Sequence, residues 1–353
     1  MKTRLLGSIV FSVAAFAVAG CGNSSTSSTP SSAALKVGLL VTGSTSDHGW
    51  NQLAADAVTK VAAAQASGAI ETQVLDHTPA DKAADAIRQL QSKGFGLVIA
   101  HGFEYLNAAK ELTDPASPGH VNARIAVSGG DVDSPNFQSL DYDLAPASYQ
   151  LGIIAAKVSK TGKLGFIGGE KIPTVTVMAA GFEAGAKSVN PKATVNVAYD
   201  DGKWDDPALA KTKAEAMIAQ GVDVIMQNVD AASSGVFEAV KERNGQRTGD
   251  AAKATVYTFG ANSDQNGNAI CGDYTLASAV IKLDVAFGKV VEQVKSNAFH
   301  GGLVKETLAN GVCMTVVNPK LAGSVITPEI QTLVDEAGKK LTTGEITLPP
   351  APQ

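Results

Sequence analysis

Aromatic and hydrogen-bonding side chains collect directly after several short apolar segments of this chain. Each segment is typical of a β-strand, and aromatic residues make up only 5% of the sequence, so their concentration at strand ends favours a role in binding. Rings stack on flat ligands, while carboxylates and amides read hydrogen bonds at a ligand's edge. The residues that follow the strands are Asp47, His48, Trp50, Asn51, Phe103, Tyr105, Trp204, Asp230, Asn262 and Asp264.

A purely structural role is the alternative for each of these residues. An aromatic side chain after a strand also serves as a hydrophobic plug between that strand and the next helix. An aspartate in the same place is a common helix N-cap, and this alternative is strongest for Asp47 and Asp230. The sequence therefore predicts a flat-ligand site and leaves the role of each single residue open.

The residues that catalysis requires do not form a recognisable pattern. The chain lacks the G-x-S-x-G and H-E-x-x-H motifs, and no cysteine lies close to a histidine in sequence. Its histidines never fall three or four positions apart, so no single helix offers two of them to a metal. We predict a binding protein with no metal and no cofactor, rather than an enzyme.

Strand-like and helix-like segments alternate along the chain, and they must position these side chains. The segments "GLVIAHG" and "DVIMQNV" are apolar on both faces, which indicates parallel sheets covered by helices. A helix–Gly–strand–turn pattern occurs once in each half of the 353 residues, and this length suits two lobes. In such sheets ligands bind beyond the carboxyl ends of the strands.

The first residues have the character of an export signal. A basic head, a short apolar segment and small residues precede Cys21, and the apolar segment is too short to span a membrane. The sequence Val18-Ala19-Gly20-Cys21 resembles the lipobox of bacterial lipoproteins. We predict a signal peptide over residues 1–20, lipidation of Cys21, and a flexible tether over residues 21–34. The folded part would then be exported and anchored to the outer side of the cell membrane.

Two further cysteines raise the question of a disulfide. Export makes a bond between Cys271 and Cys313 chemically feasible, and it would contribute roughly 3–4 kcal/mol if unstrained. Two buried free thiols are the alternative, since cysteine packs well as a small apolar side chain. We favour the disulfide. The formal net charge of −5 and the absence of a basic run beyond the N-terminal head exclude a nucleic-acid surface.

Several motifs together resemble the basic membrane protein family, the lipoprotein substrate-binding components of ABC importers. They are the export signal with its lipobox, "SDHGWNQ", "GIIAAKVSKTGKLGFIGG", "WDDPALAKTKAEAMIAQGVDVIMQNVD" and "FGANSDQNG". The resemblance runs from about residue 35 to residue 343. It implies a type I periplasmic-binding-protein fold, α/β, with two doubly wound parallel-sheet lobes joined by a multi-strand hinge. It also implies closure of the lobes around a purine base or nucleoside, and a membrane permease as partner.

The resemblance also implies roles for individual residues. Stacking rings match Trp50, Phe103 and Trp204, and polar contacts with the base or ribose match Asn51, Asp230, Asp264 and Lys282. The chain departs from the nucleoside receptors in two places. It has "SDHGWN" where they carry D-K-S-F-N, and Asn262-Ser263-Asp264-Gln265 where they carry D-x-D-Q. Both departures favour a free base, adenine-like, over a ribosylated ligand.

The division into lobes and the role of ligand capture complete these expectations. We expect lobe one at 35–143 plus 273–301, lobe two and the hinge at 144–262 plus 302–343, and a loosely attached tail at 344–353. The main hypothesis is a monomeric substrate-binding protein of an importer. A sensory receptor for a sugar or another heterocycle is the alternative, and an exported enzyme on a Rossmann-like scaffold is disfavoured because "VTGSTSDHG" lacks G-x-G-x-x-G spacing.

Overall fold

The computed structural model describes residues 34–47, 49–245 and 255–350. The predicted signal peptide, Cys21, nearly all of the tether, and His48 lie outside the described residues. From residue 34 onward, the described residues form one compact unit. Within the described residues, no helix combines the length and the apolar character needed to cross a membrane.

Two mostly parallel sheets organise the chain. In the described residues the first sheet has the strand order β11-β5-β4-β3-β1-β2, and the second has the order β12-β10-β9-β8-β6-β7. In the part of the chain that the structure describes, every strand pairing in these sheets is parallel except that of β10 with β12. The strands are β1 Leu35–Val41, β2 Ile70–Leu75, β3 Leu97–His101, β4 Arg124–Ser128, β5 Gln138–Tyr142, β6 Lys163–Gly168, β7 Thr194–Tyr199, β8 Val224–Asn228, β9 Tyr257–Asn262, β10 Thr275–Ile281, β11 Gly302–Glu306 and β12 Cys313–Val317.

Helices connect most successive strands, whereas β4 leads to β5, and β11 to β12, without a helix between them. The longer helices are α1 Trp50–Ala63, α2 Ala83–Ser92, α3 Leu106–Thr113, α4 Ala145–Val158, α5 Pro173–Val189, α6 Pro207–Ala219, α7 Ser233–Gly245, α8 Leu283–Lys295 and α9 Pro328–Thr343. Short 3₁₀ turns η1 Ala80–Lys82, η2 Phe103–Tyr105, η3 Asp230–Ala232 and η5 Gly272–Tyr274 lie between them. This arrangement confirms the expected α/β fold with two doubly wound lobes.

Local sequence explains where these elements begin and why they are buried. Helix α6 starts at Pro207, and the Asp206 side chain accepts a hydrogen bond from the Leu209 N–H, as an N-cap does. Strands β3 and β8 are buried along their whole length, which accounts for their unbroken apolar pattern. One hydrophobic cluster draws residues from both sheets, among them Leu39 and Phe166.

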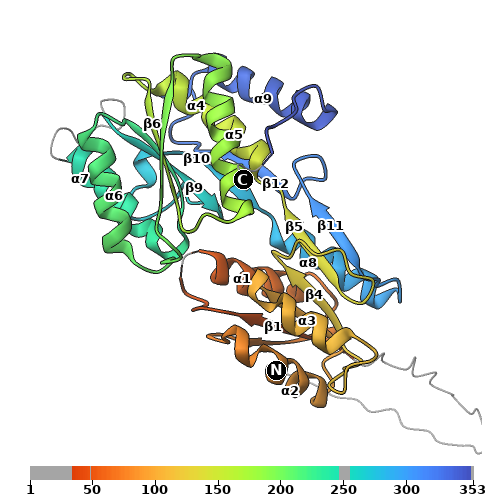
Figure 1. Ribbon diagram of the computed structural model, residues 1–353. Coiled ribbons are helices and arrows are strands. Elements are labelled where there is room, and N and C mark those ends of the chain that lie inside the picture. Colours follow the sequence, from red (N-terminus) through yellow and green to blue (C-terminus); the bar gives the residue numbers. More distant parts are fainter. Residues whose placement is uncertain (1–33, 48, 246–254, 351–353) are drawn as a thin grey trace, which may run out of the picture. The chain divides into compact units, whose positions relative to one another are not determined.

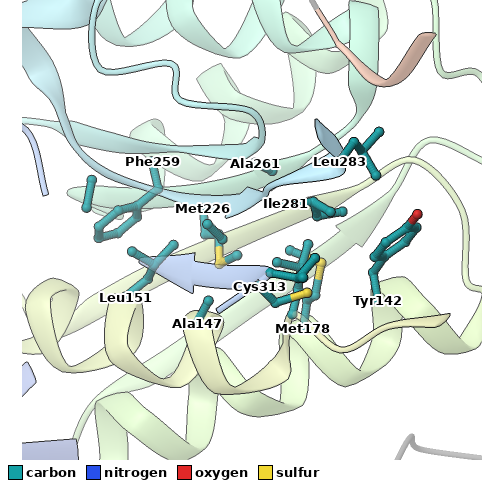
Figure 2. Packing of buried hydrophobic residues seen from close by; sticks show 14 of the residues in the cluster. Tyr142, Ala147, Leu151, Met178, Met226, Phe259, Ala261, Ile281, Leu283 and Cys313 are labelled. Atoms are coloured by element: carbon teal, nitrogen blue, oxygen red, sulfur yellow. The ribbon is translucent and has the colours of Figure 1, made fainter. Parts of the chain in front are cut away.

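Helices α4 and α5 pack closely against each other because glycines remove side chains from their interface. A Cβ atom added to Gly185 would lie 1.9 Å from the Tyr149 carbonyl oxygen, and one added to Gly152 would lie 2.1 Å from the Phe182 carbonyl oxygen. Both distances are shorter than any real contact of a Cβ atom. Met178 of α5 and Ala147 of α4 join the packed cluster shown in Figure 2.

The chain changes sheets in the C-terminal half at places other than those expected. Strand β10, assigned above to lobe one, pairs with β9 and β12 in the second sheet. Strand β11, assigned above to lobe two, pairs with β5 of the first sheet and lies beside it in Figure 1. Of the expected return segment, α8 packs against α1 of the first lobe. An apolar strand pattern shows that a strand is buried but not which sheet edge it joins.

The C-terminal segment also differs from expectation. The side chains of Ile346 and Leu348 are partly buried against the main hydrophobic cluster, so residues 344–350 are attached to the lobe rather than loose. The Ile346 N–H donates to the Lys340 carbonyl oxygen, which turns the chain back along the end of α9.

The predicted disulfide is wrong, because Cys271 and Cys313 are free thiols in different parts of the second lobe. Cys271 packs with Phe237, Val240 and Val256, whereas Cys313 belongs to the main cluster in Figure 2. Each side chain is at most 1% exposed. Burial raises the pKa of both thiols, which holds them protonated.

We therefore expect neither thiol to react in the folded protein. In a Cys21→Ser variant, where Cys271 and Cys313 are the remaining cysteines, maleimide should label neither site natively and both sites in denaturant, without reductant. Mass spectrometry counts the labels. If the two sites were labelled in denaturant only after reduction, the free thiols would be contradicted and the predicted disulfide would be supported.

Candidate ligand-binding site

A cavity of about 640 Å³ lies where the carboxyl ends of strands from both sheets meet. This volume is within the range of small-molecule sites, about 300–1,000 Å³. The lining residues come from the strand ends of both lobes, from the loops after them and from the first turns of the helices that follow. They are Thr42, Gly43, Ser44, Asp47, Trp50, Asn51, His77, Gly102, Phe103, Glu104, Gly129, Tyr142, Leu144, Ile172, Thr174, Val175, Met178, Gly202, Trp204, Asp205, Asn228, Asp230, Ala231, Asn262 and Ile281.

Trp50 stands at the start of α1 with its ring supported from one side. The His101 imidazole stacks on it with 3.8 Å between ring centroids and 24° between ring planes. His101 Nε2 lies 3.1 Å from the Trp50 carbonyl oxygen, an acceptor, so Nε2 carries the hydrogen. Burial lowers the pKa of His101 to about 3, against the opposing effect of that hydrogen bond. A neutral imidazole therefore fixes the ring and backbone of Trp50.

Trp204 reaches the same cavity from the second lobe, and a glycine makes room for it. A Cβ atom added to Gly169 would lie 2.2 Å from the Trp204 ring. The indole thus rests directly on the backbone after β6. Phe103, at the start of η2, is 44% exposed, more than Trp50 or Trp204.

Asp47 and Asn51 organise the first turn of α1 as well as bordering the cavity. The Asp47 carboxylate accepts from the backbone N–H groups of Gly49, Asn51 and Gln52, and from Asn51 Nδ2 at 2.8 Å. Asn51 Oδ1 accepts in turn from the Gly43 N–H at 3.2 Å. The helix-capping alternative therefore accounts for the hydrogen bonds of Asp47.

Asp230 connects the two lobes. Its backbone φ of 53° is in the left-handed region, and its Oδ1 atom accepts a hydrogen bond from the Trp50 N–H at the start of α1. A Cβ atom at position 49 would meet that same oxygen, so Gly49 leaves space for the approach. The positive end of the α1 dipole favours a carboxylate in this place.

Burial in the cavity raises the pKa of two of its carboxyl groups, and neighbouring negative charge adds to the shift. Burial raises the pKa of Asp230 to about 7, with a further contribution from the Asp47 charge, while the hydrogen bond from Trp50 opposes the shift. Desolvation likewise raises the pKa of Glu104, and the charge of Glu170 adds to it.

Three residues from the sequence analysis lie outside the cavity lining. Tyr105 is fully buried and donates through its hydroxyl to the Thr78 carbonyl oxygen at 2.6 Å. Asp264 accepts from the Asn266 N–H at 3.0 Å, as a turn residue does. Lys282 is exposed and immediately follows β10, where Ile281 lines the cavity. Side chains alternate in direction along a strand, so adjacent residues at a strand end face opposite ways.

Several cavity residues were not predicted from the sequence. Asn228 is the last residue of β8, and Tyr142 is the last residue of β5, so the same strand-end pattern could have identified both. Glu104 stands beside Phe103 in the same turn. Met178 gave no signal, because it lies within an apolar stretch of α5.

The two lobes and the cavity at their strand ends define a protein of type I periplasmic-binding fold. A solved ABC transporter solute-binding protein from Aeropyrum pernix K1 has the same fold, with a TM-score of 0.75 at 20% identity over 90% of this chain and 93% of that one. Residues 34–341 match the family described as ABC transporter substrate-binding protein PnrA-like, and the chain belongs to this family.

Two curated relatives indicate what similar chains bind. The ABC transporter nucleoside-binding protein BmpA of Lactococcus lactis is 28% identical over 268 residues, which cover 73% of this chain and 72% of that protein. A purine-binding protein of Brucella abortus is 29% identical over 205 residues, which cover 57% of this chain and 56% of that one. The resemblance noted from the motifs is thereby confirmed at the level of the family.

We expect Gly169→Ala to displace the Trp204 ring. The added methyl group overlaps the indole, and overpacking of this kind costs about 1–3 kcal/mol. The midpoint of urea unfolding should fall, and the near-ultraviolet circular dichroism of the indoles should change. Gly288→Ala in α8 is the matched control, because a Cβ atom there meets nothing within 4 Å. An unchanged dichroism signal in Gly169→Ala would contradict the assigned packing.

Asp230 should make stability depend on pH with a defined sign. Its pKa is about 7 in the folded state against an ordinary value of 3.8, so the folded state binds a proton that the unfolded state has lost. The free energy of unfolding of the wild type, relative to Asp230→Asn, should therefore fall as the pH rises from about 4 to about 7, and should level off above that. Urea titrations across this range measure the difference. A flat difference would show that the Asp230 carboxyl is not desolvated.

Proposed function

We propose that this chain captures a purine base or nucleoside, adenine-like, between its two lobes and delivers it to an ABC permease. The observation that carries the proposal is the set of rings around one cavity: Trp50 and Phe103 from the first lobe and Trp204 from the second. Both tryptophans of the chain border this cavity. Stacking on aromatic rings contributes about 1–3 kcal/mol for each base.

The support of the two indoles adds to this argument. Trp50 rests on the neutral His101 ring, and Trp204 rests on the backbone at Gly169. Rings fixed in this way lose little conformational entropy when a ligand stacks on them. The names of the curated relatives, one nucleoside-binding and one purine-binding, agree with a flat nitrogen heterocycle as ligand.

The mechanism requires no covalent step. In an open form the ligand meets the rings of one lobe, and closure adds those of the other and expels water. The hydrogen bond from the Trp50 N–H to Asp230 forms between the lobes at closure. The closed lobes then present a surface to the permease, whose ATPase supplies the energy of transport. We further propose that the chain acts outside the cytoplasm, held to the membrane by a lipid on Cys21.

The roles that the family resemblance implies for Asp264 and Lys282 remain a separate hypothesis. Both would hold ribose hydroxyls in a nucleoside complex, yet neither lines the cavity. A ligand without ribose needs neither residue, which agrees with the preference for a free base that the altered motifs indicate.

We expect free purines to stabilise the full chain, purified in detergent, in a thermal-shift panel. The panel contains adenine, guanine, hypoxanthine, their nucleosides, uracil, ribose and several amino acids. A ligand at about 100 times its dissociation constant adds about 2.7 kcal/mol, which raises the unfolding temperature by a few degrees. A response to ribose or an amino acid with silence from every heterocycle would overturn the purine assignment.

Calorimetric titration of Trp50→Leu and Trp204→Leu belongs to the same test. Loss of one stacking ring should weaken binding by about 5- to 150-fold, equivalent to about 1–3 kcal/mol. Phe299→Leu is the control, since Phe299 packs on the core and does not line the cavity. If Trp50→Leu, Trp204→Leu and Phe299→Leu bound the ligand with equal affinity, the stacking mechanism would be contradicted.

A further inference from the structure

A buried hydrogen-bond relay leads from the cavity residue Tyr142 to Trp50. The side chains of His101 and Ser128 are fully buried, and that of Tyr142 is 7% exposed. Ser128 Oγ lies 2.8 Å from the Tyr142 hydroxyl and 2.7 Å from His101 Nδ1. His101 Nε2 lies 3.1 Å from the Trp50 carbonyl oxygen. The relay thus joins the ends of β3, β4 and β5 to the first residue of α1.

The chemistry of these groups fixes the direction of each hydrogen bond in the relay. A carbonyl oxygen only accepts, so His101 Nε2 carries a hydrogen and donates to Trp50. The imidazole is neutral, because burial lowers the pKa of His101 to about 3, so Nδ1 carries no hydrogen and accepts from the Ser128 hydroxyl. That hydroxyl has a single hydrogen, so Ser128 Oγ accepts from the Tyr142 hydroxyl.

Aromatic packing encloses the relay. The Trp50 ring covers one face of the His101 imidazole, and the Phe287 ring of α8 meets the imidazole edge-on, with 6.1 Å between ring centroids. The Tyr142 ring in turn meets the Trp50 ring edge-on, also at 6.1 Å. Because His101 and Ser128 are fully buried, a polar atom that loses its partner here cannot turn to bulk water.

Trp50 carries two parts of the site, and His101 contacts the residue that carries both. The Trp50 ring lines the cavity and stacks on His101. The Trp50 carbonyl oxygen accepts from His101, while the Trp50 N–H donates to Asp230 of the other lobe. A rotation of the imidazole would therefore disturb the stacking surface and the interlobe hydrogen bond together.

Ser128 supplies the second of the two hydrogen bonds that hold the imidazole. The terminal torsion of a histidine side chain is broad, so one hydrogen bond at Nε2 restrains the ring loosely and a second one at Nδ1 narrows its range. The next residue, Gly129, brings the end of β4 against the indole, because a Cβ atom there would lie 3.1 Å from the Trp50 ring. The end of β4 therefore supports Trp50 through the relay and by direct contact.

We propose that Ser128 is a positioning residue for ligand capture, which acts through His101 to hold Trp50 in place. The proposal takes its ligand from the proposed function, whereas the relay itself belongs to the chain without a ligand. Loss of the Ser128 hydroxyl leaves His101 Nδ1 without a donor and the Tyr142 hydroxyl without its acceptor. The imidazole then rotates more freely, and a ligand has to order the Trp50 ring as it binds, which weakens binding.

The first experiment titrates the full chain, purified in detergent, with adenine and with adenosine in a calorimeter. Ser128→Ala should weaken binding about 2- to 10-fold, the effect of one lost hydrogen bond between neutral groups. Ser139→Ala is the matched control. Ser139 is a fully buried serine of β5 whose hydroxyl donates to the Val132 carbonyl oxygen at 2.7 Å, and it belongs neither to the cavity lining nor to the relay. This variant should lose stability and keep its affinity.

His101→Phe separates an effect through the imidazole from an effect through Tyr142. The phenyl ring keeps an aromatic surface for Trp50 but has no nitrogen for the Ser128 hydroxyl. If Ser128 acts through His101, adding Ser128→Ala to His101→Phe should change the affinity by no more than about twofold. A full effect of Ser128→Ala in that background would assign it to the freed Tyr142 hydroxyl and would overturn the proposal.

Nitrogen NMR of the full chain, labelled at its histidine side chains, tests the relay without a ligand. The His101 signals, identified by their loss in His101→Phe, should show a ring that is neutral at about pH 5, since its pKa is about 3, with its hydrogen on Nε2. Ser128→Ala should move the Nδ1 resonance toward that of an imidazole nitrogen without a donor, and Ser139→Ala should leave it in place.

A hydrogen on His101 Nδ1 in the wild type would overturn the relay. An Nδ1 resonance and an affinity that both stay unchanged in Ser128→Ala would overturn the positioning role of Ser128 while leaving purine capture intact. If neither adenine nor adenosine bound the wild type, the proposed function would fail instead, and the resonances would still decide whether Ser128 holds the imidazole.

Discussion

The site depends on the repeated passage of the chain between the two sheets. The chain leaves the first sheet after β5, returns to it through α8 and β11, and enters the second sheet again at β12. The crossings follow the carboxyl ends of β5, β10 and β11, at the edge where the two sheets face each other. Because parallel strands present their carboxyl ends together, the same edge collects the side chains that border the cavity. The topology thus brings residues far apart in sequence, such as Trp50 and Asp230, into hydrogen-bonding contact.

The cavity combines rigid rings with strained polar groups. Trp50 is fixed by a buried imidazole whose protonation is suppressed, and Trp204 is fixed by the absence of a side chain at Gly169. Asp230 and Asn262 both adopt left-handed backbone conformations, which are uncommon outside glycine. Such conformations persist where the surrounding structure determines them, and they cluster at ligand sites. The polar groups are therefore positioned before a ligand arrives, which reduces the entropy that binding must overcome.

The sequence was sufficient for the fold class and for most of the ring positions. Continuous apolar strands separated by helices indicate parallel sheets whatever the ligand, and a side chain directly after such a strand must lie at the binding edge. That rule located Trp50, Phe103 and Trp204. It failed for Tyr105 and Lys282, because a single residue's displacement along a turn or strand reverses the direction of its side chain.

Other features needed three-dimensional contacts that no local pattern encodes. The partners of β10 and β11 depend on which edge is free once the earlier strands have paired. Cys271 and Cys313 lie in different clusters although their spacing permitted a bond. The relay from Tyr142 to Trp50 joins the ends of three strands that follow one another in the sheet, and only their lateral order brings Ser128 between its partners.

The burial of both described thiols has a practical consequence for watching the lobes move. With Cys271 and Cys313 inaccessible, a cysteine introduced at the exposed cavity residue Thr174 would be the reactive position of the folded domain. An environment-sensitive dye attached there would sit where closure changes the exposure to water. Because the two native thiols are unreactive, the protein can be labelled at one engineered cysteine and used as a fluorescent reporter of its own ligand.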